Sequence, residues 1–525
     1  MKIVFRVDAS ITMGTGHVMR CRTLATVLKK QGADIQFITR AHPGHLGDML
    51  ARDGFTVILL PPPVDIENKV DDYAAWLGVS QQEDADQTIA ALAKQPCDWL
   101  IVDHYGLDRF WEALLQSLPH KLMVIDDLAN RPHECDVLLD QNYSVAGQDR
   151  YQPWVPAHCK LLLGPRYALL SPEYSQYRET MVPRTGDIKR VLVFMGGSDN
   201  ANITGKVLSA LSAGQFAHLE VDVVVGSNFI HKDDVNRQAN ARLRTHIHGP
   251  RLHLADLMVR ADLAIGGGGG TTWERLCLGL PSLVLSIAEN QIPACEALAS
   301  SEFIRYLGDG CKIDVTAIES ALFDILEDIG KLLALENSFK ALVDGRGTDR
   351  VAEVIIPTPA EVLMLRQANS NDALTYFSWV NDPMVRSNAI NSEPVDMAIH
   401  LEWFDNRLKD VNSYLYVLEA GNLPIGQIRF EQQSAEATID YSLDVLVRGR
   451  GWANKLLKIG IEAFNNIRPT LLKATVKPEN ISSAMTFVRR GFVQLVTDYS
   501  GGGNLHFQLL LSQIKIVGST IGCLK

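Results

Sequence analysis

The chain has 525 residues, of which 46% are hydrophobic and 21% are charged. This composition is typical of globular domains and excludes an intrinsically disordered chain, while the length predicts two or three separately cored units. The formal net charge of −11 argues against a general nucleic-acid surface, which needs clustered Lys and Arg, and it favours small-molecule substrates.

The first 160 residues alternate strand-like and helix-like patterns. The apolar run Lys2–Val7 leads through a glycine-containing turn into a helical pattern at Val18–Lys30. Arg6 and Asp8 interrupt the apolar stretch that a secretory signal would need, and no later run has membrane length, so we expect a cytoplasmic protein without a membrane partner. Further strands are predicted at 35–38, 57–60, 99–102 and 122–125. This alternation predicts a parallel sheet with helices on both faces.

The same scheme restarts at Arg190. A strand at Val191–Met195 enters Gly196–Asp199, and a helix follows to about Leu211. Later strands are predicted at 221–225, 263–265 and 282–286, with helices at 317–327 and 329–342. We therefore expect an α/β fold whose first part consists of two doubly wound, Rossmann-like lobes, at 1–160 and 161–346.

The pattern changes after a connector that contains Pro357 and Pro359. Proline disfavours helix at and before its own position, so a linker is predicted at 347–361. Beyond it, helices are predicted at 372–379, 400–409, 453–464 and 481–489, and strands at 414–419, 424–431, 438–446, 471–476 and near 493 and 507. These elements predict a mixed α+β domain at 362–512, followed by a tail at 513–525.

The turn Gly14-Thr15-Gly16-His17 lies where the first strand leads into a helix. Glycines there allow close approach of a ligand, and the amides at the helix start favour an anion. His17 can accept a proton near neutral pH, although a surface histidine at the helix start is the alternative. Asp8 and Asp103 are candidates to orient His17 or to bind sugar hydroxyls, or they are only turn residues at strand ends.

Five glycines, Gly266–Gly270, join a predicted strand to Thr271-Thr272-Trp273-Glu274. A diphosphate would be held well by the amides of such a loop. Thr271 and Glu274 also match a capping box, so Glu274 is either a ligand-binding residue or only a helix cap.

These motifs together resemble, over roughly residues 1–345, the UDP-sugar hydrolase family of pseudaminic acid biosynthesis, a relative of the bilobed MurG-like glycosyltransferases of GT-B type. The resemblance rests on the segments Phe5–Ser10, Gly14–Ala25, Asp103–Tyr105, Gly196–Asp199, Gly266–Glu274 and Glu289–Gln291. It implies that His17 is the catalytic base. It further implies that the UDP-sugar is bound by Asp8, Gly14, Gly16, Arg20, Tyr105, Gly197, Ser198, Gly268, Gly269, Thr271, Thr272, Glu274, Asn290 and Gln291.

A single base suits this chemistry because UDP departs as a stabilised anion, whereas an alkoxide leaving group must be protonated. We expect His17 to deprotonate a water that attacks C1 opposite the departing UDP, with inversion and without a metal.

A second anion-binding loop is predicted at Val447–Ala453, which matches R-x-x-G-x-A and precedes a helix. A glycine turn with incidental arginines is the alternative. With the downstream residues Asn480 to Phe492, this loop resembles the GNAT acetyltransferase family over about 363–511. Two further segments, Trp379–Pro383 and Ile425–Gln427, resemble the N-acetyltransferase of the pseudaminic pathway. The resemblance implies acetyl-CoA as cosubstrate, bound by Leu446, Arg448, Gly449, Arg450, Gly451, Trp452, Ala453, Asn480 and Ser483.

One position departs from that pattern. Many family members carry at the position of Phe487 a tyrosine that protonates the leaving thiolate, and Phe487 has no proton to give. The thiolate is then protonated by water or by Ser483, or it leaves without a proton. The general base is not assigned, and Glu431, Asp440 and Tyr441 are the candidates.

The expected function is therefore a fusion of two consecutive steps, 4-N-acetylation of a UDP-amino-sugar and release of UDP from the UDP-diacetamido-sugar. The eight cysteines are scattered and predict neither a disulfide framework nor a zinc site. A UDP-sugar-dependent glycosyltransferase, or a nucleotide-sugar sensor with a protein acetyltransferase domain, is the alternative. The oligomeric state stays open.

Overall fold

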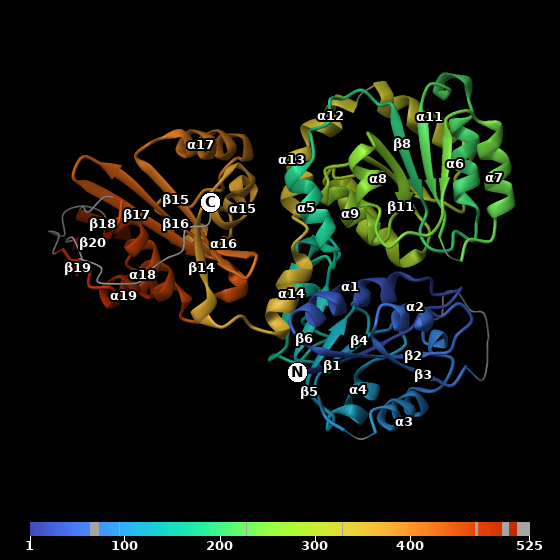
Figure 1. Ribbon diagram of the computed structural model, residues 1–525, viewed down its shortest axis with the longest axis horizontal. Coiled ribbons are helices and arrows are strands. Elements are labelled where there is room, and N and C mark those ends of the chain that lie inside the picture. Colours follow the sequence, from blue (N-terminus) through green and yellow to red (C-terminus); the bar gives the residue numbers. More distant parts are fainter. Residues whose placement is uncertain are drawn as a thin grey trace. The chain divides into compact units, whose positions relative to one another are not determined.

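The computed structural model describes residues 1–63, 73–93, 95–145, 147–226, 228–327, 329–467, 471–495 and 503–511. The chain divides into two compact units, Met1–Ile356 and Pro357–Lys525, coloured blue to yellow and orange to red in Figure 1. The predicted tail at 513–525 lies outside the described residues. Within the described ranges, no helix is both long enough and apolar enough to cross a membrane.

The first unit begins with a seven-stranded parallel sheet in the order β3-β2-β1-β4-β5-β6-β7. Strands β1 and β4 lie at its centre and are almost wholly buried, because helices cover both faces. The elements of this lobe are β1 (Lys2–Val7), α1 (Gly16–Lys30), β2 (Asp34–Arg40), α2 (Gly47–Arg52), β3 (Thr56–Leu60), α3 (Gln81–Ala91), β4 (Cys97–Asp103), α4 (Arg109–Leu115), β5 (Pro119–Ile125), β6 (Val137–Asp140) and β7 (Lys160–Leu163).

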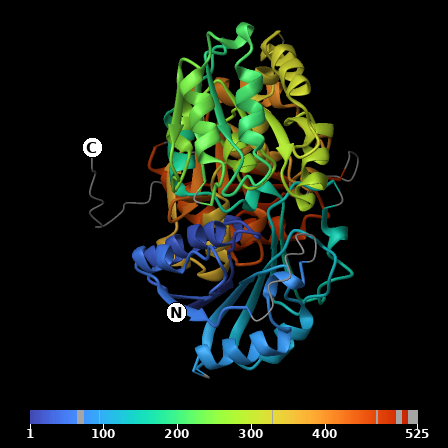
Figure 2. The same cartoon turned by 90° about the vertical axis from the view of Figure 1, so that its right-hand side faces the viewer.

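The second lobe has a six-stranded parallel sheet in the order β10-β9-β8-β11-β12-β13, and Figure 2 shows the two sheets of the unit one above the other. Its strands are β8 (Arg190–Phe194), β9 (Glu220–Val224), β10 (Thr245–His248), β11 (Leu263–Gly267), β12 (Ser282–Ser286) and β13 (Arg305–Asp309). Its helices are α5 (Pro172–Thr180), α6 (Ile203–Leu211), α7 (Lys232–Ala241), α8 (Ala255–Arg260), α9 (Thr271–Cys277), α10 (Ile292–Ser300), α11 (Val315–Glu327), α12 (Ile329–Ala334), α13 (Glu336–Leu342) and α14 (Gly347–Ile355). The predicted pair of Rossmann-like lobes is confirmed.

Two predicted boundaries are wrong. Strand β7 starts at residue 160 and pairs with β6, so the first sheet continues past the predicted end of its lobe. The predicted linker at 347–361 is helical in its first part, since α14 buries Val351, Ala352 and Ile355 at helical spacing and packs against α1. The prolines that suggested a linker restrict only the backbone beside them, which follows α14.

The second unit has a seven-stranded mixed sheet in the order β14-β15-β16-β17-β18-β20-β19, in which only β17 and β18 are parallel. Helices α15 and α17 pack with β15 and β16, and α18 also packs on the sheet. The elements are β14 (Met364–Gln367), α15 (Ala373–Val380), α16 (Pro383–Asn388), α17 (Met397–Lys409), β15 (Ser413–Ala420), β16 (Leu423–Gln433), β17 (Glu436–Leu443), α18 (Trp452–Asn465), β18 (Leu471–Val476), α19 (Ile481–Arg489), β19 (Val493–Gln494) and β20 (Leu505–Leu510).

Strand β17 ends at Leu443, although the sequence predicted a strand to residue 446. The side chain of Asp444 accepts a hydrogen bond from the amide of Leu446 and starts a short 3₁₀ turn.

Candidate functional site

A histidine–aspartate pair lies where the two central strands of the first sheet end. His17 is the second residue of α1, and Asp103 is the last residue of β4, the neighbour of β1. Nδ1 of His17 lies 2.6 Å from Oδ1 of Asp103. Arg20, one turn further along α1, donates to both oxygens of Asp103 at 2.7 Å. The side chains of His17 and Asp103 are 12% and 0% exposed, so the histidine alone of this pair reaches solvent.

The charges around Asp103 keep it ionised. Burial alone would raise the pKa of Asp103, but the charges and hydrogen bonds of Arg20 and His17 outweigh it and hold this pKa well below its usual value. Nδ1 of His17 lies beside both the ionised Asp103 and Nη2 of Arg20, at 3.2 Å, and we assign the ring proton to Nδ1, where Asp103 accepts it. Nε2 then carries the free lone pair of the neutral ring, which is the form that a general base needs.

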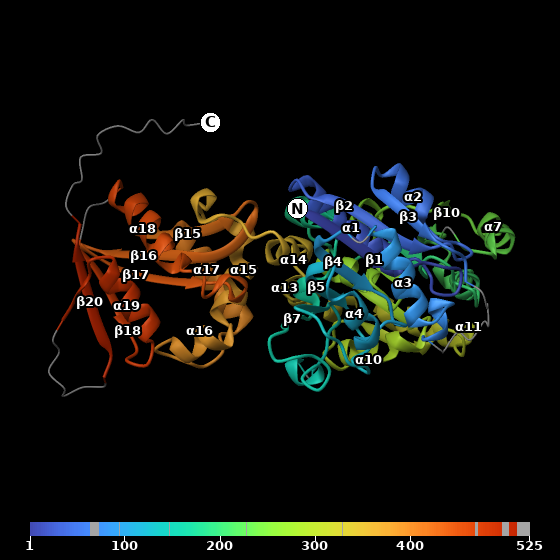
Figure 3. The same cartoon turned by 90° about the horizontal axis from the view of Figure 1, so that it is seen from below.

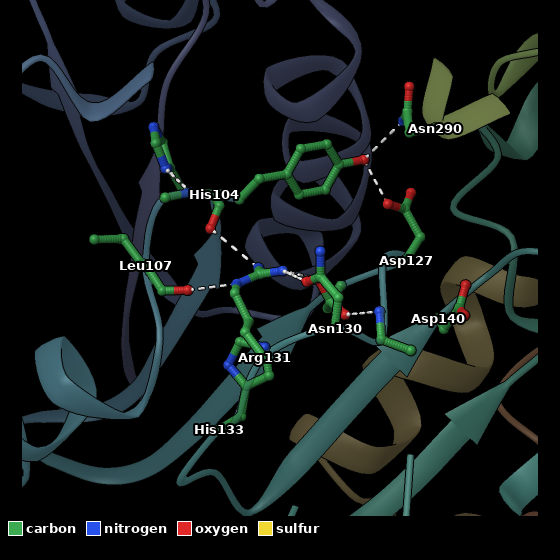
Figure 4. A network of polar contacts seen from close by, with 12 residues as sticks. His104, Leu107, Asp127, Asn130, Arg131, His133, Asp140 and Asn290 are labelled. Atoms are coloured by element: carbon green, nitrogen blue, oxygen red, sulfur yellow. Dashed lines mark hydrogen bonds and ion pairs between the residues drawn. The ribbon is translucent and has the colours of Figure 1, made fainter. Parts of the chain in front are cut away.

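Tyr105 joins this pair to the second lobe. Its ring meets that of His17 edge to face, with 4.6 Å between centroids. Its hydroxyl donates to Asp127 and accepts from Nδ2 of Asn290 at 3.2 Å. Figure 4 shows Asp127 and Asn290 pointing toward this hydroxyl from the two lobes. The structure therefore brings Tyr105 and Asn290, both predicted site residues, into direct contact.

A cavity of about 390 Å³ lies beside Tyr105 and is lined from both lobes. Its lining residues are Asp127, Asn142, Tyr143, Ser144, Val145, Arg150, Asn290, Pro293, Ala294 and Ala297. Sequence reasoning missed Asp127. It follows the predicted strand at 122–125, and the rule that ligands bind at the carboxyl ends of parallel strands would have found it.

Asp8 does not face this cavity. Its side chain is 0% exposed and pairs with Arg6, while Oδ1 also accepts from Thr39 and from the amide of Arg40. These hydrogen bonds hold Asp8 in the interior at the end of β1, and its contact with substrate stays a prediction. Gly14 above it has φ of 76°, a backbone conformation that favours glycine, and Gly16 begins α1.

The glycine-rich loop 266–270 packs closely on its own lobe. A Cβ at Gly266 would overlap Arg275, and a Cβ at Gly268 would overlap Sγ of Cys295, whereas one at Gly270 would meet no atom within 4 Å. Gln291 lies against Gly268 and Gly269, and its Oε1 accepts from the amide of Ile287. Packing thus accounts for part of the glycine run, and the backbone at its end is open.

The predicted capping box of α9 is not formed, because Gly270 is the N-cap and no side chain caps it. Glu274 instead accepts a hydrogen bond from the hydroxyl of Tyr174. Burial raises the pKa of Glu274 to about 7, against the opposing effects of that bond and of Arg275. Thr271 and Thr272 both lie within hydrogen-bonding distance of the Arg275 guanidinium.

The Gly196–Asp199 turn of the second lobe touches the first. A Cβ at Gly197 would lie 2.6 Å from Oγ1 of Thr15, so only glycine lets these two loops approach so closely. Oγ of Ser198 is buried and has no hydrogen-bond partner among the residues that the structure describes. Asp199 accepts from the amides of Ile203 and Thr204 at the start of α6, whose N-cap is Asn202.

The loop before α18 has an open backbone. Gly449 and Gly451 have φ of 82° and 75°, and a Cβ at either would meet no atom within 4 Å. Gly451 is the N-cap of α18 and gives no side-chain cap, so the amides of Trp452 and Ala453 stand at an open helix start. The guanidinium of Arg448 forms an ion pair with Asp382 and donates a hydrogen bond to the carbonyl of Leu443.

Three other predicted acetyl-CoA residues have internal contacts. Leu446 is buried, and its amide donates a hydrogen bond to the side chain of Asp444. Arg450 lies over the ring of Trp452, 5.0 Å from its centroid.

The second part of this candidate site is a pair of hydroxyls. Asn480 caps α19 by accepting from the amide of Ser483, and Oγ of Ser483 lies 3.1 Å from the hydroxyl of Tyr441. The candidate bases Glu431 and Asp440 form ion pairs with Arg429, so each carboxylate already has a cationic partner. Among the residues that the structure describes, no group of three or more His, Cys, Asp or Glu side chains is placed to hold a metal.

Residues 363–493 match the family model described as acetyltransferase (GNAT) domain. An uncharacterised protein of Methanocaldococcus jannaschii, MJ1062, is 23% identical over 515 residues, which cover 94% of this chain and 96% of that protein.

Two further relatives match about 40% of the chain at 29% identity. They are the spore coat polysaccharide biosynthesis protein SpsG of Bacillus subtilis and the UDP-2,4-diacetamido-2,4,6-trideoxy-beta-L-altropyranose hydrolase of Campylobacter jejuni. The matches span 62% and 66% of these two relatives. The chain thus joins a GNAT acetyltransferase domain to a region related to UDP-sugar enzymes.

Proposed function

We propose that the first unit hydrolyses a UDP-sugar and that the second unit acetylates the amino group of that sugar beforehand. The observation that carries the hydrolase proposal is the contact of His17 Nδ1 with buried, ionised Asp103, which leaves Nε2 of the partly buried ring as the base. The similarity to the hydrolase of Campylobacter jejuni supports the same chemistry.

In this mechanism His17 takes a proton from a water that attacks C1 of the sugar as the bond from C1 to the UDP oxygen breaks. Asp103 stabilises the imidazolium that forms, and Arg20 balances the charge of Asp103. The UDP oxygen leaves as an anion without protonation. We place the diphosphate at the loop 266–270 and the uridine ribose at Glu274. Attack from the face opposite UDP inverts the configuration at C1.

For the second unit we propose 4-N-acetylation of a UDP-4-amino-4,6-dideoxy sugar by acetyl-CoA. The match to the GNAT family model and the open amides after Gly451 support the loop 448–453 as the pyrophosphate site. The product of this step, a UDP-2,4-diacetamido-2,4,6-trideoxy sugar, is the substrate that we propose for the first unit.

Mass spectrometry of the products tests both steps at once. The full chain, given the UDP-4-amino-sugar and acetyl-CoA, should yield UDP, free coenzyme A and the free diacetamido sugar labelled by ¹⁸O from water. The variant His17→Asn should accumulate the acetylated UDP-sugar, with hydrolysis slowed by about a hundredfold or more.

Two results would overturn the proposal. Unchanged hydrolysis in His17→Asn would exclude His17 as the base. Release of UDP only when a sugar or lipid acceptor is added would identify a glycosyltransferase that uses the same site.

A further inference from the structure

The strands β17 and β18 separate part of the way along the second unit. They are paired at Glu436–Thr438 with Leu471–Lys473, and no pairing follows. Tyr441 lies on the part of β17 beyond this pairing, and α19 follows β18 in the chain. Figure 3 labels β17, β18 and α19 in the second unit. The hydroxyl of Tyr441 reaches Ser483 of α19 at 3.1 Å, so this pair bridges the two sides of the opening.

Transfer of an acyl group from a thioester to an amine expels a thiolate, and a nearby acid speeds that departure. Phe487 has no acidic proton; it is buried among Phe492, Phe507 and Tyr441. The ring of Tyr441 meets that of Phe487 edge to face at 5.6 Å. Tyr441 is the one tyrosine in β17, β18 and α19 together. Its phenol ring contacts Phe487, which has no hydroxyl.

We propose that Tyr441 is the acid that protonates the leaving thiolate of coenzyme A. This inference rests on the acetyl transfer proposed above. As the amine nitrogen bonds to the acetyl carbon, the carbon–sulfur bond breaks and its electron pair stays on sulfur. The Tyr441 hydroxyl gives its proton to that sulfur. The tyrosinate is then reprotonated by solvent, which also receives the proton lost by the amine.

The neighbouring groups are less suited to this role. Thr486 already donates its hydroxyl proton to the carbonyl of Ser482. Ser483 carries an aliphatic alcohol, a weaker acid than a phenol, and the Asn480 cap holds its backbone so that Oγ faces Tyr441. Burial raises the pKa of Tyr441, against hydrogen bonds with Ser483 and Thr486 that lower it, so the hydroxyl keeps its proton at neutral pH.

The decisive variant is Tyr441→Phe in the full chain. We expect acetyl transfer to slow by about a hundredfold, with acetyl-CoA affinity and melting temperature unchanged. The double variant Tyr441→Phe/Phe487→Tyr should recover most of the lost rate, because it returns a phenol to the adjacent side chain. Tyr414→Phe, on β15 of the same sheet, serves as the control and should match wild type.

A second measurement needs no acceptor sugar. Titration of the thiol of bound coenzyme A, followed by thiolate absorbance, should give a lower thiol pKa in wild type than in Tyr441→Phe, since the phenol donates to the thiolate. An equal thiol pKa in both proteins, or a Tyr441→Phe rate within twofold of wild type, would overturn the assignment. If the amino-sugar is not acetylated at all while the thiol pKa still differs, the proposed substrate is wrong and the role of Tyr441 stands.

Discussion

At the scale of single residues, the chemistry of the first unit depends on partners that are distant in sequence. Asp103 lies 86 residues from His17, and its carboxylate meets the imidazole at Nδ1. Asp103 itself cannot be the base, because its side chain is 0% exposed and its pKa is held well below the usual range. In the proposed mechanism His17 is therefore the base, Asp103 a positioning residue and Arg20 a charge-balancing residue.

We predict that Asp103→Asn lowers the kcat of UDP-sugar hydrolysis by about a hundredfold or more and leaves UDP affinity nearly unchanged. The asparagine has no charge to favour the Nδ1–H tautomer or to stabilise the imidazolium. Steady-state kinetics and UDP calorimetry on the same preparation measure both quantities. The control is Asp53→Asn, which breaks an ion pair with Arg22, a residue of α1 like His17. Wild-type turnover in Asp103→Asn would contradict the role of Asp103.

Glu274 makes stability depend on pH. Its pKa is about 7 in the folded protein against an ordinary value of 4.5, so between these values the folded state binds more protons than the unfolded state. The free energy of unfolding should therefore fall, relative to Glu274→Gln, by on the order of 2 kcal/mol as pH rises from about 4.5 to about 7. Urea unfolding of both proteins at several pH values measures this difference. A constant difference would show that the Glu274 carboxyl is not perturbed.

At the scale of elements, loops between strands and helices carry both candidate sites. The same sequence feature, a glycine-rich turn after a strand, has two physical origins here. Gly266 and Gly268 are required by close packing on Arg275 and Cys295, whereas Gly449 and Gly451 have positive φ and face open space. Glycines of the first kind let a loop pack closely on its neighbours, and glycines of the second kind leave the backbone accessible to a ligand.

We predict opposite outcomes for two substitutions in one loop. Gly268→Ala should lower stability by about 1–3 kcal/mol and weaken UDP binding, because the new methyl group overlaps Sγ of Cys295 and displaces the loop. Gly270→Ala should be tolerated in stability, since its Cβ meets no atom within 4 Å and its φ is −53°. Thermal unfolding and UDP titration compare the pair. Equal behaviour of the two variants would mean that the loop relaxes freely.

At the scale of the whole molecule, the chain consists of two units with separate sheets and cores. Helix α14 closes the first unit, because its buried face packs on α1 and Thr348 donates to the carbonyl of Leu170. The dividing point is thus after Ile356, beyond that helix.

Residues 1–356 and 357–525, made separately, should each fold, the first releasing UDP and the second binding acetyl-CoA. Truncation at residue 346 is the informative comparison, since it removes α14 and should destabilise the first unit. Circular dichroism and UDP release measure the two truncations. Identical stability of 1–346 and 1–356 would contradict the structural role of α14.

In the full chain, Gly451→Asp should abolish acetyl-CoA binding and leave UDP-sugar hydrolysis unchanged. The carboxylate would stand at the open helix start where a pyrophosphate is expected, and φ of 75° disfavours any side chain. Calorimetry with acetyl-CoA and the hydrolysis assay are performed on the same folded protein. Loss of hydrolysis without loss of folding would show that the two sites depend on one another.

The sequence by itself determined the fold class, the division into two units and most strands, because these follow from local apolar periodicity and from turn residues. Four strands that it missed, β6, β7, β10 and β14, have only four residues each, which is too short for a period to be recognised, and the five-residue β13 was missed as well. The two glycine-rich loops were also predicted from the sequence, since glycine after a strand is a local signal, whereas Tyr105 and Asn290 were predicted from the family resemblance and, with His17, stay predictions as site residues.

Only the tertiary structure decided which of these residues act together. The pairing of His17 with Asp103, the burial of Asp8, the bond from Tyr174 to Glu274 and the meeting of Tyr441 with Ser483 all join separate elements. Such contacts depend on strand order and on the packing of helices against the sheet, and a pattern along one segment carries no information about either. The same holds for α14, whose place in the first unit follows from its contact with α1.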